Sequence, residues 1–277
     1  MESNNPSVLI GCPTYVGMKY CLDDFLEGIK SIDFDNYTLL LVDNSDTDSY
    51  YNIIKEKKIN VLRFNPEDKN KINRLIDSRN KIIEYAISKN CDFILMLDQD
   101  VIVPPNIINK LLSSKKDLIS GVYLNYFYSS GKLKFLPVAW LDITEEEFEQ
   151  IKSKQIKFPE YVKSAKDLSR HMTLEEYESN KTYKVKHPSA GCLLISKNIF
   201  EKIKYENLDL KSMGFKTEKQ ALDDLGFRKR ANELGFDFYI DTSVKCKHLI
   251  DGKYIKDEKG NLHHPIRYNE DEKINPQ

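Results

Sequence analysis

Short apolar segments alternate with helical patterns along the first half of the chain, and this alternation restricts the fold more than any other feature. Each apolar segment is nearly continuous, as expected of a strand that is buried on both faces. The predicted strands are 8–11, 38–42, 61–64, 93–97 and 118–123, and the predicted helices between them are 19–29, 48–58 and 72–87. The alternation predicts an α/β fold with a mostly parallel central sheet and helices on both faces.

Polar residues directly follow three of the predicted strands. In parallel sheets, ligands bind beyond the carboxyl ends of the strands, and neighbouring strands bring these ends to one edge. We therefore expect a binding site at this edge. Its candidate residues are Pro13, Thr14 and Tyr15 after the first strand, Asp43 and Asn44 after the second, and Asp98, Gln99 and Asp100 after the fourth.

Asp98 and Asp100 lie one residue apart at the tip of the buried segment 93–97. Two carboxylates in one turn form the hard oxygen site that Mg²⁺ or Mn²⁺ prefers, and such ions leave positions open for phosphate oxygens. The alternative is that both side chains cap the following turn, as aspartate often does after a strand. The pair on its own leaves both interpretations open.

The composition and charge exclude several classes of protein. Hydrophobic residues make up 40% of the 277 residues and charged residues 31%, which is typical of a soluble globular protein. The 42 basic and 43 acidic residues give a net charge of −1, so no global field attracts nucleic acid or an anionic membrane. Neither a secretory signal nor a membrane span is visible, and five scattered cysteines fit reduced thiols. We expect a cytoplasmic protein without an integral membrane segment and without a nucleic-acid partner.

The second half of the sequence is less regular. Segment 142–186 is charged and weakly periodic, which predicts surface helices or a mobile insertion. The later elements are expected to be a strand over 191–196, a helix from about 198, a helix over 223–234 that Gly235 closes, and a strand over 236–240. The residues from 251 onward are polar and predict a tail.

Four sequence motifs carry a resemblance to a known family: VLIGCPTY (8–15), LLLVDNSDTD (39–48), DSRN (77–80) and ILMLDQD (94–100). In order and spacing they resemble the nucleotide-binding half of GT-A fold glycosyltransferases, particularly the family-2 type. In those enzymes the first strand ends in a Pro-Thr-Tyr-like turn and the second in an Asp-rich turn. An Arg-Asn pair lies on the helix before the D-x-D strand.

A second group of residues extends the resemblance downstream. The family often carries a Glu-Asp pair that opens a helix, then an Arg, a Gly, and a His thirteen residues beyond the Gly. The residues in that register here are Asp223 and Asp224, Arg230, Gly235 and His248. The chain departs from the pattern because Asp223 replaces the Glu and Gly226 stands where a further acidic residue is usual.

The resemblance covers roughly residues 8–250 and implies one GT-A domain with mostly parallel central strands. Its nucleotide-sugar-binding half spans 1–125 and ends in the D-x-D motif, and its acceptor-binding and catalytic half spans 126–250. Residues 251–277 are left as a polar tail. The acceptor motif of processive synthases is not visible in the sequence, so the expected enzyme is non-processive.

The resemblance assigns a donor site for a UDP- or GDP-sugar. Asp43 would accept the ring N–H of the base in a charge-assisted bond, although an Asx-turn explains it nearly as well. Pro13, Thr14 and Tyr15 would line the base and ribose through main-chain contacts and packing. The remaining donor-site residues are Arg79, Asp98 and Gln99.

The position of Arg79 in its predicted helix also indicates a role. It lies on the core-facing stripe of the predicted 72–87 helix, where a guanidinium must reach solvent or find an anion. The anion is either the nucleotide or a carboxylate of a buried ion pair, with Asp77 or the neighbourhood of Asp92 as candidates. We favour the nucleotide.

The implied metal ligands are Asp98, Asp100 and His248. An imidazole ligand favours Mn²⁺ over Mg²⁺, and the cation would neutralise the charge that develops on the departing nucleoside diphosphate. His187, His263 and His264 lack the register that distinguishes His248. A single histidine after a strand is otherwise more often structural.

The implied reaction is transfer of the sugar to an acceptor hydroxyl with inversion, with Asp224 as the base and Asp223 positioning the acceptor. Both residues also suit an ordinary helix start. The acceptor would be a glycan, a lipid-linked sugar or a protein. Its binding surface is expected around 125–186, where Tyr123, Tyr126, Tyr128 and Trp140 either stack on a sugar ring or belong to the core.

Three alternatives remain open. A retaining GT-A enzyme would use the same D-x-D and histidine without Asp224 as base. A nucleotidyltransferase would also bind Mg²⁺ on a parallel sheet, but it usually has a Gly-rich basic loop after the first strand. A non-catalytic nucleotide-sugar-binding protein would keep Asp43 and Asp98 and need no Asp224.

Overall fold

The structure is a computed structural model, and it describes most of the chain. The described residues are 5–65, 67, 70–129, 132–154, 158, 162–208 and 224–249, with the backbone alone at 128–129, 132–133, 255–256 and 262–263. No helix in these parts of the chain is both long and apolar enough to cross a bilayer.

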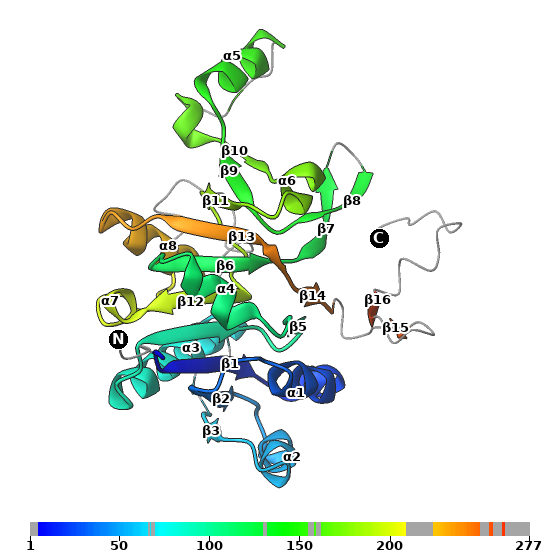
Figure 1. Cartoon of the computed structure of the whole chain (residues 1–277), viewed down its shortest axis with the longest axis vertical. Coiled ribbons are helices and arrows are strands. Elements are labelled where there is room, and N and C mark those ends of the chain that lie inside the picture. The colour runs from blue at the N-terminus through cyan, green and yellow to red at the C-terminus, as the bar shows by residue number, and fades with distance from the viewer. Residues whose placement is uncertain are drawn as a thin grey trace.

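An eight-stranded sheet forms the centre of the molecule, with strand order β11-β13-β6-β12-β4-β1-β2-β3 (Figure 1). Its strands are β1 (Val8–Thr14), β2 (Tyr37–Asp43), β3 (Val61–Arg63), β4 (Phe93–Leu97), β6 (Leu118–Val122), β11 (Thr182–Val185), β12 (Cys192–Ser196) and β13 (Phe238–Lys245). β4, β1, β2 and β3 are mutually parallel, and β13 is parallel to β6. β12 runs antiparallel between β4 and β6, and β11 is antiparallel to β13. The predicted mostly parallel α/β fold is confirmed.

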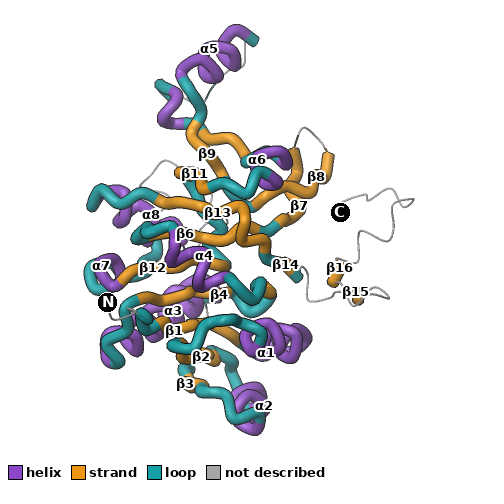
Figure 2. The backbone as a smooth tube through the Cα atoms, in the orientation of Figure 1, coloured by secondary structure: helices purple, strands orange, loops and turns teal. Residues whose placement is uncertain are grey.

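Helices cover both faces of this sheet (Figure 2). One face packs against α1 (Leu22–Lys30), α2 (Ser49–Glu56) and α4 (Ile107–Ser113), and the other against α3 (Lys71–Ser88), α7 (Lys197–Phe200) and α8 (Asp224–Glu233). Successive residues of β1 alternate between the two cores: Val8 and Ile10 belong to one and Leu9 to the other. Strands buried on both faces explain the continuous apolar runs in the sequence.

The predicted 72–87 helix is α3, and its ends follow from its sequence. The Asn70 side chain accepts hydrogen bonds from the amides of Ile72 (2.9 Å) and Asn73 (3.3 Å), which caps the helix. The predicted stripe faces the core, with Ile76, Ile82, Ile83 and Ala86 buried. Gly235 follows α8 with a φ of 80°, as its predicted role at the end of that helix requires.

The described residues of 140–178, which include most of the weakly periodic region, form a projection at one end of the molecule that we call the arm (Figure 1). It contains β9 (Trp140–Asp142), α5 (Glu145–Ser153), a short 3₁₀ helix η2 (Ala165–Asp167), β10 (Ser169–His171) and α6 (Leu174–Glu178). β10 pairs antiparallel with β9, and the hairpin β7 (Leu124–Ser129) and β8 (Lys132–Pro137) precedes the arm. The sequence predicted either surface helices or a mobile insertion for 142–186. The described residues contain the helices α5 and α6, and they also contain the small β9–β10 sheet.

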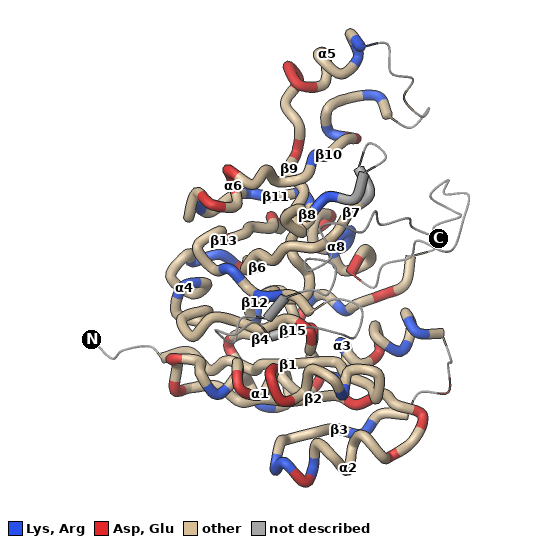
Figure 3. The backbone as a smooth tube through the Cα atoms, turned by 90° about the vertical axis from the view of Figure 1, so that its right-hand side faces the viewer, with Lys and Arg blue, Asp and Glu red and all other residues tan. Residues whose placement is uncertain are grey.

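Short elements complete the carboxyl edge of the sheet. A 3₁₀ helix, η1 (Val16–Cys21), follows β1, and β5 (Val101–Ile102) pairs antiparallel with β14 (Lys247–His248). Within the predicted tail, the structure describes only β15 (Ile255–Lys256) and β16 (Leu262–His263), which pair antiparallel. Lysine and arginine are interspersed with aspartate and glutamate along the chain (Figure 3), consistent with the net charge of −1.

Candidate active site

The turn after β4 holds the two carboxylates of the D-x-D motif at the carboxyl edge of the sheet. The amide of Val101 donates to the carbonyl of Asp98 (3.0 Å), which closes the turn, and the amide of Asp98 donates to the carbonyl of Gly191 (3.0 Å). Gly191 lies close to two side chains, because a Cβ there would be 2.7 Å from an Asp98 carboxylate oxygen and from the Tyr123 hydroxyl, and both would have to move aside. The close approach of this loop therefore fixes where Asp98 lies.

Asp98 forms an ion pair with Arg79 of α3, with 2.8 Å between Oδ1 and Nη2. The Arg79 side chain is only 2% exposed, whereas that of Asp98 is 34% exposed. The Arg79 guanidinium also lies over the ring of Tyr205, 5.3 Å from its centroid. Arg79 thus occupies the core-facing position that its stripe predicts. Its carboxylate partner is the D-x-D aspartate rather than Asp77 or one near Asp92.

Asp100 lies beside His248, with 3.6 Å between Oδ2 and Nε2. The pairing of β14 with β5 brings the histidine here, because His248 stands opposite Val101 and the amide of Leu249 donates to the Asp100 carbonyl (2.8 Å). The ring of Tyr123 packs against that of His248 at a centroid distance of 4.8 Å. The structure thus brings together two residues that are 148 positions apart in the sequence.

The donor set at the tip fits a hard divalent cation that keeps phosphate ligands. Two atoms that each lie ~2.1 Å from one ion are about 3 to 4 Å apart, and the Asp100–His248 separation of 3.6 Å falls in that range. Among the residues that the structure describes, no group of three or more His, Cys, Asp or Glu side chains could hold an ion by itself. An ion at this tip would therefore need further ligands, such as the phosphate oxygens that Mg²⁺ commonly binds.

The acidic tip changes the protonation of its neighbours. Burial, followed by the charge of Asp100, raises the pKa of Cys21 to about 12 and raises the pKa of Tyr20. Burial, followed by the charge of Asp98, raises the pKa of Tyr123 well above its usual value. All three groups are therefore neutral at physiological pH and supply no charge to balance the carboxylates.

Gln99 points into the protein between the two aspartates. Its side chain is 1% exposed, and its carbonyl accepts hydrogen bonds from the hydroxyls of Thr14 and Tyr50, the latter at 3.0 Å. Its amide nitrogen donates to the carbonyl of Met18 (2.8 Å). Gln99 therefore ties the D-x-D turn to β1, η1 and α2, and its contact with the nucleotide stays a prediction.

The turns after β1 and β2 lie side by side, because Thr14 and Asp43 are partners in the parallel register. Pro13 and Thr14 are buried, whereas Tyr15 is 48% exposed at the surface. The amide of Val16 donates to the hydroxyl of Ser45 (2.8 Å), which joins the two turns. Of the three predicted residues after β1, Tyr15 is the one whose side chain is open to a ligand.

Asp43 is fully buried and only half satisfied. Its Oδ1 accepts hydrogen bonds from the amide and the hydroxyl of Ser45, at 3.1 and 2.5 Å. Its Oδ2 is buried and has no hydrogen-bond partner among the described residues. Because a buried carboxylate oxygen without a donor costs about 1–3 kcal/mol or more, Asp43 is the strongest single indication of a ligand at this edge.

Asp224 begins α8, and Asp223 lies outside the described residues. The Asp224 side chain is 15% exposed and lies 3.3 Å from Nε of Arg228, one turn along the helix. Gly226, which replaces the expected acidic residue, lies against the chain at Glu206, where a Cβ would be 2.1 Å from the Glu206 carbonyl oxygen. The departure from the family pattern therefore has a packing reason.

Tyr205 links α8 to the D-x-D turn, and sequence reasoning missed it. Its ring stacks on Phe227 of α8, with centroids 4.6 Å apart, and its other neighbour is the Arg79 guanidinium. The Asn80 side chain holds its backbone with two hydrogen bonds of 2.8 Å, one as donor and one as acceptor. The Arg-Asn pair thus holds Tyr205 between α3 and α8, a role that only long-range contacts reveal.

The fold defines a class of protein: an α/β domain of the GT-A type, here with two carboxylates and a histidine at the carboxyl edge of its sheet. The sequence profile described as glycosyl transferase family 2 matches residues 10–204. The chain therefore belongs to glycosyl transferase family 2. Among curated proteins, none matches the sequence.

Two solved structures provide a comparison of the fold. GalNAc-T7, solved with UDP, GalNAc and Mn²⁺, superposes over 89% of this chain with a TM-score of 0.54 and 13% identity. Staphylococcus aureus TarS matches 42% of this chain with a TM-score of 0.32 and 18% identity. The chain spans 44% of GalNAc-T7 and 21% of TarS. The expected GT-A fold and family resemblance are confirmed.

Proposed function

We propose that the chain transfers a sugar from a UDP- or GDP-sugar to an acceptor hydroxyl, with Mn²⁺ or Mg²⁺ as cofactor, in a non-processive reaction that inverts the anomeric centre. The acceptor is a glycan, a lipid-linked sugar or a protein. The observation that carries the proposal is the carboxyl edge itself, where Asp100 and His248 lie 3.6 Å apart. Membership of glycosyl transferase family 2 supports it.

The donor nucleotide is proposed to bind beside Asp43. Its Oδ2, without a partner among the described residues, would accept the ring N–H of uracil or guanine. Tyr15 offers an exposed ring next to this turn, on which a base could stack. GalNAc-T7 shares the fold and is seen with UDP and Mn²⁺, so these are the first ligands to test.

Asp98, Asp100 and His248 are proposed to hold the cation. When bound, it would neutralise the negative charge that develops on the departing diphosphate. Arg79 fixes the Asp98 carboxylate through the 2.8 Å ion pair, and the β5–β14 pairing fixes the histidine opposite Val101. These residues are therefore oriented before the donor arrives.

Asp224 is proposed to accept the proton of the acceptor hydroxyl while that oxygen bonds to the anomeric carbon and the sugar–phosphate bond breaks. The nucleoside diphosphate leaves with the bonding electron pair. Arg228 lies 3.3 Å from Asp224 one turn along α8 and helps to fix the position of its carboxylate. Asp224 therefore works by its position, and Asp223 is proposed to orient the acceptor.

Thermal stability with UDP, GDP and their common sugars, with and without Mn²⁺, tests the donor site. Wild type should be stabilised by one nucleotide only when the metal is present. At a free ligand concentration of 100 times the dissociation constant, the free energy of unfolding rises by about 2.7 kcal/mol. Asp100→Asn should lose the metal-dependent part, and Asp43→Asn should weaken binding of every ligand with that base.

Asp237→Asn is the matched control, because Asp237 is exposed at the start of β13 and pairs with Lys184. It should behave as wild type. Absence of any nucleotide effect in wild type would reject the donor site. If binding is intact, NMR of the product anomer then distinguishes inversion from retention, and retention would remove the base role from Asp224.

A further inference from the structure

Four rings gather where the arm joins the sheet, and we call them the ring cluster: Phe127 of β7, Trp140 of β9, His171 of β10, and His187 before β12. Trp140 lies at the centre. Its ring centroid is 4.7 Å from that of His171, 5.5 Å from that of Phe127 and 6.1 Å from that of His187. Phe127 and His171 are also in contact, at 4.6 Å. The cluster is therefore continuous and built from four separate segments.

The ring cluster lies on the opposite side of its strands from the hydrophobic core. Along β9, Ala139 and Leu141 belong to the core, so Trp140 between them points the other way. Met172 is fully buried in the same core, and its neighbour His171 is only partly buried. All four rings remain partly accessible. The cluster thus forms an aromatic surface that packing of the core does not require.

Each histidine of the cluster has one ring nitrogen inside the protein. The Nδ1 atoms of His171 and His187 are buried, whereas their Nε2 atoms are not among the buried polar atoms of the described residues. Burial lowers the pKa of His171, and burial with the nearby charges of Arg228 and Lys186 lowers the pKa of His187 to about 3. Both imidazoles are therefore neutral at physiological pH, and Nε2 of each can donate or accept one hydrogen bond to an uncharged hydroxyl.

His187 is the ring of the cluster that lies nearest in the chain to the proposed catalytic residues. Arg228, whose charge acts on His187, pairs with Asp224 at 3.3 Å. His187 is also only four residues from Gly191, the glycine that lies against Asp98, and four residues span at most about 14 Å. His187 therefore lies within about 14 Å of Gly191 beside the D-x-D turn, and it feels the charge of the arginine that pairs with Asp224.

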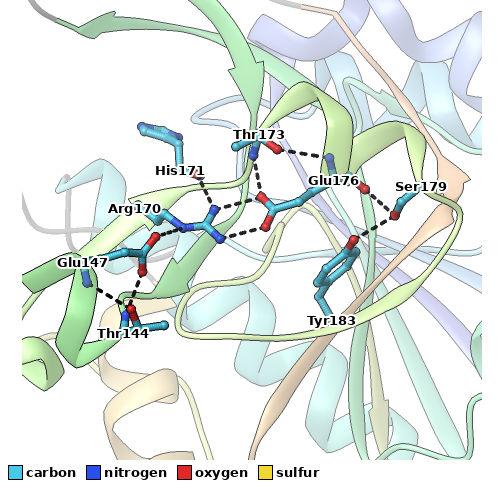
Figure 4. Close-up of polar contacts among 8 residues, drawn as sticks. All are labelled: Thr144, Glu147, Arg170, His171, Thr173, Glu176, Ser179 and Tyr183. Carbon is cyan, nitrogen blue, oxygen red and sulfur yellow. Dashed lines mark hydrogen bonds and ion pairs between the residues drawn. The ribbon is translucent and has the colours of Figure 1, made fainter.

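The arm holds the His171 side of the cluster in place (Figure 4). Arg170 pairs with Glu176 through two hydrogen bonds of 2.8 Å, lies 3.3 Å from Glu147, and donates to the carbonyl of His171 (3.3 Å). The His171 ring points away from this network. The neighbouring arginine therefore fixes the backbone of His171 and leaves its ring available.

We propose that the ring cluster binds the sugar ring of the acceptor, with Trp140 as the stacking platform and the two imidazoles as hydrogen-bond partners of its hydroxyls. This inference rests on the proposed glycosyltransferase function, which places an uncharged hydroxyl of the acceptor near Asp224. Ligand sites that combine aromatic walls with a few oriented polar atoms are typical of small-molecule recognition. The proposal selects a saccharide acceptor, in which the sugar ring itself is recognised, over a bare peptide.

Trp140 is the only tryptophan of the chain, so its fluorescence reports on this cluster alone. The protein, loaded with UDP and Mn²⁺, is titrated with the methyl glycosides of glucose, galactose, mannose and N-acetylglucosamine. At least one should change the emission in a saturable way. Phe127→Ala and His171→Ala should weaken that glycoside about 10-fold, the effect of losing one stacked or bonded ring. No saturable change with any glycoside would overturn the proposal.

Activity gives the second readout. With the best glycoside as acceptor, Trp140→Ala should raise its KM about 10-fold and leave donor hydrolysis by water unchanged, and Trp140→Phe should restore most of the loss. Tyr51→Ala is the matched control, since Tyr51 is a half-buried ring on α2, beside Lys55. An unchanged acceptor KM in Trp140→Ala rejects this inference alone. Loss of nucleotide binding in wild type would instead reject the proposed function.

Discussion

The carboxyl edge of the sheet and the arm both depend on an arginine that pairs with carboxylates, but the two arginines lie in different surroundings. Arg79 is 2% exposed and lies between α3, the D-x-D turn and Tyr205. Arg170 is 34% exposed and joins Glu147 to Glu176 at the surface of the arm. Because screening by water weakens exposed pairs, the same chemistry holds the edge more firmly than the arm.

This difference suits the two proposed tasks. A donor site handles one nucleotide and one cation, so its ligands gain from being fixed in advance. The support that Arg170 gives an acceptor site on the arm is more exposed, although Leu141, Met172 and Tyr177 of the arm pack into the core of the central sheet. The buried pair at the edge and the exposed pair in the arm should therefore respond differently to substitution.

The largest expected effect on stability is at the edge. Arg79→Met should lower the free energy of unfolding by about 2–4 kcal/mol, because it leaves Asp98 without its buried partner. Urea denaturation measures this. Lys81→Met on the same helix is the control, since Lys81 forms an exposed pair with Glu84 and should cost less than about 1 kcal/mol. Equal losses in the two variants would contradict the contrast.

A smaller loss is expected in the arm. Arg170→Met should cost about 1–2 kcal/mol, since it removes a two-pronged pair that is partly exposed. Hydrogen exchange should quicken in α5 and α6 and stay unchanged in β1 and β4. Lys152→Met, in an exposed pair with Glu149 of the same arm, should change little. Faster exchange throughout the sheet would show that the arm and the edge are one cooperative unit.

The pH dependence of stability tests the burial of His187 at the junction of arm and sheet. The pKa of His187 is lowered to about 3 in the folded chain, against about 6.5 when unfolded. The unfolded state therefore binds more protons below pH 6.5, and stability falls as the pH drops from 6.5 towards 3. His187→Gln should remove up to about 1 kcal/mol per pH unit of this slope between pH 6.5 and 5. An unchanged slope would mean that His187 is solvated.

The smallest effect is expected at the helix caps. Thr173→Ala removes the hydroxyl that accepts from the amide of Glu176 (3.1 Å), and it should cost about 1 kcal/mol. Thermal unfolding compares it with Ser153→Ala at the end of α5 in the same arm, where the exposed hydroxyl only donates to the carbonyl of Gln150 (2.8 Å) and a smaller loss is expected. A loss above 3 kcal/mol for Thr173→Ala would mean that the arm supports the whole domain.

Most of the edge could be predicted from the sequence, because its residues follow their own strands. Thr14 and Asp43 lie side by side through the parallel register, and Arg79 faces inward because its helix is regular. His248 was identified by its position thirteen residues beyond Gly235, and the structure places this histidine beside Asp100. Whether these residues bind a nucleotide and a metal stays a prediction.

The arm was harder to predict, although it carries local signals. The Thr-x-x-Glu patterns at 144–147 and 173–176 are capping boxes, and they would have marked the starts of α5 and α6. The ion pairs of Arg170 with two such glutamates could not be found in this way. The contact of Trp140 with His187 could not be predicted either, because it joins segments that are 47 residues apart.

The sequence by itself determined the layered α/β fold and the position of the acidic tip, because strand and helix periods and the carboxyl-edge rule act over short stretches of chain. Only the tertiary structure decided which carboxylate pairs with Arg79, which oxygen of Asp43 lacks a donor, and which rings meet around Trp140. Those outcomes depend on the packing of elements distant in sequence, where burial selects partners that no local pattern specifies.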